Sequence, residues 1–124
     1  MNLIPNLFKR KTKVEYQLSD IPLTTDMHSH LLPGIDDGAQ DLEESLSLIR
    51  QLTELGYEKL ITTPHIMGDF YQNTPAIIEE RLSTVQKAVA AEGLSVTLEA
   101  GAEYYLDEWF PEKLERGEIQ SFGD

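Results

Sequence analysis

The fold of this chain is decided by residues 59–65, which read KLITTPH. The apolar and β-branched residues in the middle of this stretch predict a short buried strand, which the proline and the histidine close. A helix is predicted directly before it, because Asp41 suits the N-cap and Glu44 follows three residues later in a capping-box arrangement. Its apolar face is formed at helical spacing by Leu42, Leu46, Ile49, Leu52 and Leu55. Gly56 suits the left-handed conformation just past the helix end.

The same alternation extends on both sides of this unit. Upstream, residues 23–28 predict a first strand, and the proline and glycines of residues 32–39 exclude regular structure after it. Downstream, Thr74 predicts the cap of a second helix with Pro75 in its first turn. The buried stripe of this helix is expected to consist of Ile78, Leu82, Val85 and Val89, and Gly93 ends it. A third strand is expected over residues 96–102, running into Glu103, and a shorter helix over 108–115.

Strands that alternate with helices predict an α/β fold with parallel strands and right-handed helical crossovers. About three such units cannot close a barrel, so the pattern fits either a small open sheet or part of a larger barrel. The last residues, 121–124, carry no stop signal, which favours the second interpretation. Residues 1–20 lack periodicity and are interpreted as a flexible basic leader, with weak attraction to an anionic membrane as the alternative. The folded part is expected to span residues 21–124.

Composition narrows the chemistry that is possible. The chain has no cysteine, which excludes disulfides, thiolate zinc sites and a cysteine nucleophile. Its net charge of −12 argues against nucleic acid as a partner, and it disfavours anionic substrates unless bound cations reverse the local field. No apolar run approaches the ~20 residues that span a bilayer, and no signal peptide is evident. We therefore expect a cytoplasmic protein without a transmembrane segment, with a homo-oligomer as a possible assembly.

Metal-binding side chains follow each predicted strand. His28 and His30 share one face at the end of the first strand, because side chains of a strand alternate. His65 follows the second strand and Glu103 follows the third, and these are the only 3 histidines of the chain. The carboxyl ends of parallel strands meet at one rim, so these groups are expected to converge. Imidazole and carboxylate ligands suit zinc, iron or manganese, and the sequence therefore predicts a divalent metal site.

Three acidic residues near the histidines extend the candidate set. Asp36 and Asp37 offer carboxylates from the loop after the first strand, and Asp26 is expected either to bind metal or to support a ligand.

Three stretches also carry a family resemblance. Residues 26–39 (DMHSHLLPGIDDGA), 63–65 (TPH) and 101–105 (GAEYY) resemble the PHP (polymerase and histidinol phosphatase) superfamily. Within it, the chain is similar to the manganese-dependent protein-tyrosine phosphatases of bacterial capsule and exopolysaccharide operons. The resemblance runs from about residue 22 to the end. It implies the N-terminal part of a PHP-type distorted (β/α)7 barrel, with up to three metal ions at its C-terminal rim.

The resemblance also implies roles for individual residues. His28 and His30 match the pair on the first metal, Glu103 matches the carboxylate that bridges the first and second metals, and Asp37 and His65 match ligands of the third. Asp26 matches a supporting acidic residue. The family has a further Glu, a further His and a late Asp-x-His, which would fall after residue 124. The chain is accordingly expected to be truncated, and no catalytic residue apart from the metal ligands is identified.

The function implied by the resemblance is metal-dependent hydrolysis of phosphotyrosine in a protein, namely the tail of a tyrosine autokinase that regulates polysaccharide export. Manganese is the expected metal, with iron or zinc as alternatives. Two other functions stay open: a catalytically incomplete fragment that binds metal or a partner, and a phosphoesterase acting on a small phosphate monoester.

Aromatic residues near the predicted rim have two interpretations. Tyr104, Tyr105 and Trp109 are expected to pack beneath the rim, with lining of a substrate groove as the alternative. The stretch that follows His65 is interpreted either as a wall of the pocket or as a simple connection; its candidate residues are Met67, Asp69, Phe70 and Tyr71.

Overall fold

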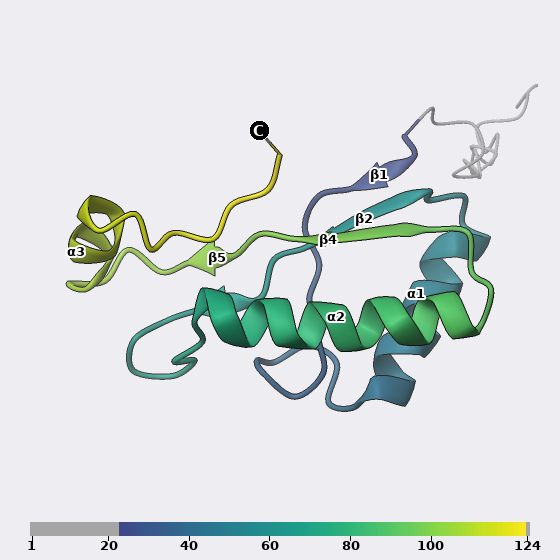
Figure 1. The fold of residues 1–124 in the computed structure, drawn as a ribbon, viewed down its shortest axis with the longest axis horizontal. Helices are drawn as coiled ribbons and strands as arrows, with labels where there is room; N and C mark the ends of the chain where they lie inside the picture. Colours follow the sequence, from purple (N-terminus) through teal and green to yellow (C-terminus); the bar gives the residue numbers. More distant parts are fainter. Residues whose placement is uncertain (1–22, 124) are drawn as a thin grey trace, which may run out of the picture.

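The structure, a computed structural model, describes residues 23–123, and the basic leader expected over residues 1–20 lies outside them. Five strands and three helices follow one another along the described chain (Figure 1). In chain order they are β1 (Thr25–Asp26), α1 (Leu42–Glu54), β2 (Lys59–Thr62), β3 (His65–Ile66), α2 (Pro75–Ala91), β4 (Thr97–Ala100), β5 (Glu103–Tyr104) and α3 (Phe110–Glu115).

The strands form two small parallel sheets. The first has the order β1-β2-β4, and the second pairs β3 with β5. Thr62 pairs with Ala100 and His65 pairs with Glu103, so both sheets share an offset of 38 residues and the second continues the first. The predicted parallel α/β arrangement is therefore confirmed, while the handedness of the crossovers and the barrel stay predictions.

The division into two sheets differs from the sequence-based prediction. β3 was not expected, and the strand expected over 96–102 is interrupted at residues 101–102. Pro64 has no amide hydrogen to donate, so it cannot extend the ladder of β2, although its carbonyl accepts a bond of 2.9 Å from the Glu103 amide. On the neighbouring strand, a Cβ at Gly101 would lie 2.7 Å from the Phe122 ring. Backbone bonds continue across the interruption, since the Gly101 amide donates to the Thr62 carbonyl at 2.9 Å.

The first strand is also shorter than expected. Only Thr25 and Asp26 pair with β2, instead of residues 23–28. Beyond them the chain stays near β2, because the Thr63 amide donates to the Ser29 carbonyl at 2.7 Å. The Thr62 hydroxyl also donates to the Ser29 carbonyl and accepts from the Leu31 amide. Residues 28–30 are thus held beside β2 outside a regular strand.

Both long helices lie on one side of the first sheet (Figure 1), and they enclose the core with it. The expected stripe of α2 is buried at all four positions. The face of α1 is buried only in its central turns, since Leu42 and Leu55 at its two ends are 36% and 50% exposed. The cluster of buried residues consists of Leu31, Leu32, Leu46, Ile49, Leu60, Ile66, Ile78, Leu82, Val85, Val89, Leu98 and Ala100.

The helix starts follow the predicted capping. The Asp41 side chain accepts from the Glu44 amide at 2.8 Å, and the Thr74 side chain accepts from the Ile77 amide at 3.3 Å. The Glu44 carboxylate returns to the Gln40 amide rather than to the cap residue itself. The last helix begins two residues later than expected, at Phe110.

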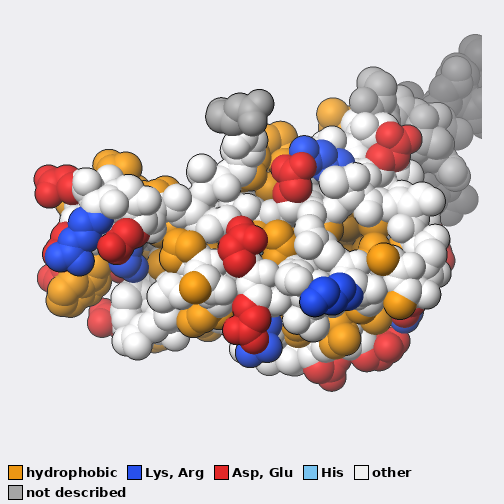
Figure 2. All heavy atoms as spheres, in the orientation of Figure 1, with side chains coloured by type: hydrophobic (Ala, Val, Ile, Leu, Met, Phe, Trp, Pro, Cys, Tyr) orange, Lys and Arg blue, Asp and Glu red, His pale blue; other side chains and the backbone are white. Residues whose placement is uncertain are grey.

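On one face of the molecule, charged side chains are scattered rather than gathered in one patch (Figure 2). On the face shown in Figure 2, acidic side chains are scattered, and the basic side chains at the α3 end lie beside acidic ones. Within residues 23–123 no helix is long and apolar enough to cross a membrane.

Asp107 fastens the turn after β3 to the segment before α3. Its carboxylate accepts from the Gly68 amide at 3.0 Å and from the amides of Trp109 and Phe110. These bonds hold the pKa of Asp107 below its ordinary value of 3.8, and the bond from Gly68 has the largest effect. Because the folded-state pKa is lowered, the stabilisation is complete above pH 3.8 and is lost as the pH falls through the lower, folded-state pKa.

We therefore expect Asp107→Asn to lower the free energy of unfolding at neutral pH. Below pH 3.8, the stability of the variant should fall less with decreasing pH than the stability of the parent. Urea unfolding of both proteins across this pH range measures the difference. A constant difference between the two proteins at all pH values would contradict the role of the Asp107 charge.

Candidate metal centre

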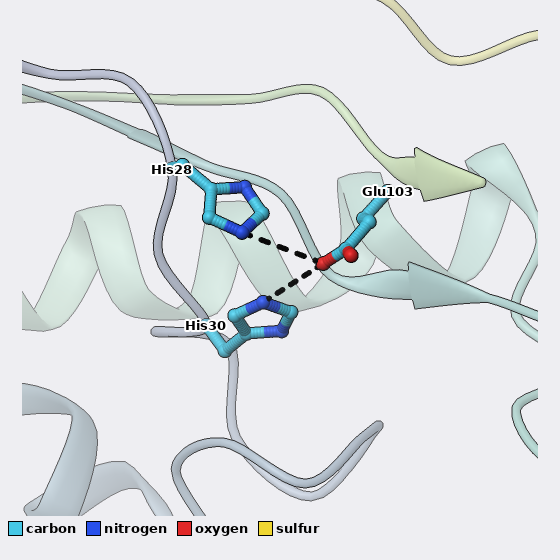
Figure 3. Close-up of side chains that lie close together, drawn as sticks. All are labelled: His28, His30 and Glu103. Atoms are coloured by element: carbon cyan, nitrogen blue, oxygen red, sulfur yellow. Dashed lines mark ion pairs between the residues drawn. The ribbon is translucent and has the colours of Figure 1, made fainter. Parts of the chain in front are cut away.

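His28 and His30 reach the rim from the extended segment after β1. The Nε2 atom of His28 lies 3.5 Å from Oε2 of Glu103, and Nε2 of His30 lies 3.2 Å from the same oxygen (Figure 3). Their rings stand nearly perpendicular, at 88° with centroids 5.4 Å apart. The predicted convergence of both imidazoles with Glu103 is thus observed.

His65 brings the third imidazole to the same carboxylate. It pairs in register with Glu103 at the start of β3 and β5, and its Nδ1 lies 3.5 Å from Glu103 Oε2. Its Nε2 faces the loop after β1 and lies 3.3 Å from Oδ1 of Asp37. One carboxylate oxygen therefore has a nitrogen of each histidine within 3.5 Å.

The loop over residues 33–39 folds back against His30. A Cβ at Gly38 would clash with the backbone and Cβ of His30, so only glycine permits this approach. The Ala39 amide donates to the His30 carbonyl at 3.1 Å. This return places Asp36 and Asp37 beside the histidines.

The two aspartates of this loop have different environments. The Asp37 side chain is 62% exposed and faces His65, whereas the Asp36 side chain is 1% exposed. Asp36 accepts from Nδ1 of His30 at 2.8 Å, from the His65 amide at 3.0 Å and from the Gly38 amide at 3.0 Å. Asp36 thus holds the loop and two histidine segments together, and its oxygens already have protein partners.

The rings of His28 and His30 are oriented by contacts of their Nδ1 atoms, and these contacts turn Nε2 toward Glu103. Nδ1 of His30 lies 2.8 Å from the Asp36 carboxylate, which leaves Nε2 as the ring nitrogen that faces Glu103. Nδ1 of His28 lies 2.8 Å from the Thr63 hydroxyl, which leaves Nε2 toward Glu103. This is the arrangement in which an outer partner orients a metal-binding histidine.

Two sets of donor atoms meet the spatial requirement for a metal ion. They are His28, His30 and Glu103, and His30, Asp37 and His65, with donor atoms within 4.8 Å of one another in each set. The sets share His30, but its Nδ1, the atom 3.9 Å from Asp37, is engaged by Asp36. His30 is therefore better suited to the Glu103 set. Nitrogen and oxygen donors without thiolate fit zinc, iron and manganese, so the residues present fit a divalent metal.

Asp26 lies outside both donor sets. One of its carboxylate oxygens, Oδ2, is buried and has no hydrogen-bond partner among the described residues. Asp26 is therefore not assigned to either set, and its role as a supporting residue stays a prediction.

Several residues that shape the site were not singled out from the sequence. Thr63 was only part of a quoted motif, and Asn73 was not considered. The Asn73 amide donates to the carbonyls of Ile35 and His65, which ties the loop after β1 to β3. Tyr71, which was a candidate for the pocket wall, does reach the site: its ring stacks on His65, with centroids 5.4 Å apart and planes at 13°. No local signal in the sequence marks Asn73, because its partners are 38 and 8 residues away along the chain.

The expectation for the aromatic residues after Glu103 is met by only one of them. Tyr104 packs against the core cluster, and burial raises its pKa above the ordinary value. Tyr105 is 60% exposed and Trp109 is 50% exposed, because they lie past the part of β5 that faces the helices.

The donor sets lie apart from two cavities of the described residues. Two cavities, of about 440 and 470 Å³, lie between the start of α2 and α3. None of the residues that line them belongs to the donor sets. The donor side chains differ in exposure, from 21% for His30 to 63% for His28.

Replacing Asp36 by alanine is expected to weaken divalent metal binding about 10- to 100-fold, because His30 loses the partner that fixes its ring. Asp36→Asn, which keeps an acceptor oxygen, should lose less. Calorimetric titration with Mn²⁺ measures both. Asp41→Asn, which changes a capping carboxylate away from the rim, is the control, and equal affinities in all four proteins would refute the role of Asp36.

The chain is similar to proteins of known family. A family model described as "Capsular polysaccharide synthesis, CpsB/CapC" matches residues 24–124. The chain is 29% identical over 99 residues to the tyrosine-protein phosphatase YwqE of Bacillus subtilis, covering 80% of this chain and 39% of the relative. It is 28% identical over 99 residues to the tyrosine-protein phosphatase CpsB of Streptococcus pneumoniae, covering 80% and 41%.

A solved structure gives the same result. It comes from a crystallographic study of YwqE from Bacillus subtilis and CpsB from Streptococcus pneumoniae, which describes these proteins as unique metal-dependent tyrosine phosphatases. It matches with a TM-score of 0.72 at 28% identity, covering 79% of this chain and 40% of the other. The chain spans about two fifths of the length of the curated relatives it matches.

Proposed function

Because the chain belongs to the CpsB/CapC family of capsular polysaccharide synthesis, we propose that it acts in metal-dependent hydrolysis of phosphotyrosine in a protein. The observation that carries this proposal is the meeting of His28, His30 and His65 at one oxygen of Glu103. All ion-pair partners of Glu103 within residues 23–123 are these histidines. No cysteine nucleophile exists in the chain, so a metal centre is the chemistry that the available residues support.

The residues of the chain have separate tasks in this proposal. His28 and His30 present Nε2 to the metal position, Glu103 supplies the negative charge, and Asp37 with His65 forms the neighbouring donor group. Asp36 and Thr63 keep two of the rings in orientation. When bound, divalent cations supply the positive charge that activates water and neutralises phosphate oxygens. They also offset the net charge of −12, which would otherwise repel the substrate.

The finer parts of the proposal extend the family membership. The metal would be manganese. It would be bound by nitrogen and oxygen donors only, without a thiolate. The substrate would be the phosphotyrosine tail of an autokinase that regulates polysaccharide export, and the site of action would be the cytoplasm. The fold would be the first part of a PHP-type barrel. The helix layer on one side of the first sheet and the parallel pairing of the strands support this last point.

The proposal is tested by phosphate release from a phosphotyrosine peptide with the 124-residue chain and Mn²⁺. We expect hydrolysis that needs the metal and that is lost in His28→Ala. A phosphoserine peptide and a small phosphate monoester, measured in parallel, separate a protein-tyrosine phosphatase from a general phosphoesterase. A folded chain that binds Mn²⁺ and hydrolyses none of the three would overturn the enzymatic proposal for this chain, and it would favour the metal-binding fragment.

A further inference from the structure

The metal-site face of the small β3–β5 sheet continues past the ligands. His65 and Glu103 pair in register, and the ladder extends one step further because the Tyr105 amide donates to the Ile66 carbonyl at 3.2 Å. Side chains of a strand alternate between faces, so Met67 lies on the His65 side and Tyr105 on the Glu103 side. The residues between them turn the other way: Ile66 is buried in the core, and Tyr104 packs against it.

A tight turn brings a third side chain to this face. Met67 and Tyr71 exchange two backbone hydrogen bonds of 2.9 Å, so their side chains stand on the same side of the turn. The ring of Tyr71 then lies flat on His65, with planes at 13°. Asp107 holds this turn through the Gly68 amide, which limits its freedom to move away.

These three side chains are available to a ligand. Met67 and Tyr71 are partly buried, and Tyr105 is 60% exposed although it is a large aromatic residue. Such exposure carries no advantage for folding, since Tyr105 forms no part of the buried cluster. Its place directly beyond Glu103 makes it continuous with the donor sets.

We propose that Met67, Tyr71 and Tyr105 form a wall that receives the aromatic ring of the substrate and makes the site prefer aryl over alkyl phosphates. This inference rests on the proposed function. In a phosphotyrosine the ring is bonded to the ester oxygen itself, so a phosphate held at the donor sets brings the ring beside them. The wall offers one thioether and two aromatic faces there, the groups that pack best on such a ring.

The experiment compares two phosphonates that cannot be hydrolysed, phenylphosphonate and methylphosphonate, by calorimetric titration of the Mn²⁺-loaded chain. An aromatic contact contributes about 0.5–1.5 kcal/mol, which corresponds to a preference of roughly 2- to 12-fold for the phenyl compound. Tyr105→Ala should reduce the preference to near unity and leave the affinities for Mn²⁺ and methylphosphonate unchanged. Tyr105→Phe should keep the preference.

Leu106→Ala is the matched control, because Leu106 is 76% exposed on the neighbouring position of the chain. It should bind both phosphonates as the parent does. If both compounds bind and Tyr105→Ala keeps the full preference, the wall is refuted while the proposed function stands. If the Mn²⁺-loaded chain binds neither compound, the proposed function fails, and the wall fails with it.

Discussion

Replacing Glu103 by glutamine is expected to weaken Mn²⁺ binding by more than 100-fold and to abolish any metal-dependent hydrolysis. The loss of an outer partner costs about 10- to 100-fold in metal affinity. Glu103 is expected to contact the metal itself, because its Oε2 is the oxygen that all three histidines face. Its loss should therefore cost more than the loss of an outer partner. An amide has the same shape but no charge, and it leaves the cation with neutral imidazoles only.

The variant should remain folded without metal, since the Glu103 side chain is 41% exposed and its backbone pairing with β3 is unchanged. What it should lose is the stabilisation by metal. A ligand at 100 times its Kd stabilises a protein by about 2.7 kcal/mol, which is roughly a 10 °C rise in Tm for a domain of this size. The parent chain should show this rise with Mn²⁺ and the variant should not.

Glu108→Gln is the matched control. It removes the same charge from an exposed carboxylate five residues further along the chain. Thermal unfolding with and without Mn²⁺, and calorimetry for the affinity, measure all three proteins. Equal Mn²⁺ affinity for the parent and Glu103→Gln would show that the convergence of histidines on this oxygen is not a metal site.

The second large effect is expected at Leu60, for which alanine should reduce the free energy of unfolding by about 2–5 kcal/mol. Leu60 is fully buried in β2, the central strand between β1 and β4. Its side chain belongs to the buried cluster that includes residues of both long helices. Replacement by alanine would therefore leave a cavity among side chains that are already packed. A loss of this size is a large part of the 5–15 kcal/mol that stabilises an ordinary domain.

Urea unfolding measures this loss from the midpoint and the m value. Leu55→Ala is the control, because Leu55 is 50% exposed at the end of α1 and should change stability by no more than about 0.5 kcal/mol. The same loss in both variants would mean that the side of the sheet covered by the helices is not the main core.

The sequence was sufficient for the parts of this fold that depend on periodicity. The stripe of α2, the caps at Asp41 and Thr74 and the parallel order of the strands follow from local spacing. So does the convergence of His28, His65 and Glu103, because parallel strands end at a common rim. These features need no knowledge of distant contacts.

Other features depend on contacts between distant residues and were not predicted. The short β3–β5 sheet pairs His65 and Ile66 with Glu103 and Tyr104, which are 38 residues away along the chain. The different environments of Asp36 and Asp37 arise from the loop's return to His30, which Gly38 permits. Two adjacent identical residues give no local signal that one is buried and the other exposed.

The central claim, that the histidines and Glu103 form a metal centre, is tested most directly by diffraction from crystals of the chain grown with Mn²⁺, using anomalous scattering to locate manganese. The account predicts manganese bound by His28, His30 and Glu103, with Asp37 and His65 as ligands of a neighbouring ion. A well-ordered chain with no manganese at these residues, at Mn²⁺ concentrations that saturate binding in solution, would contradict it.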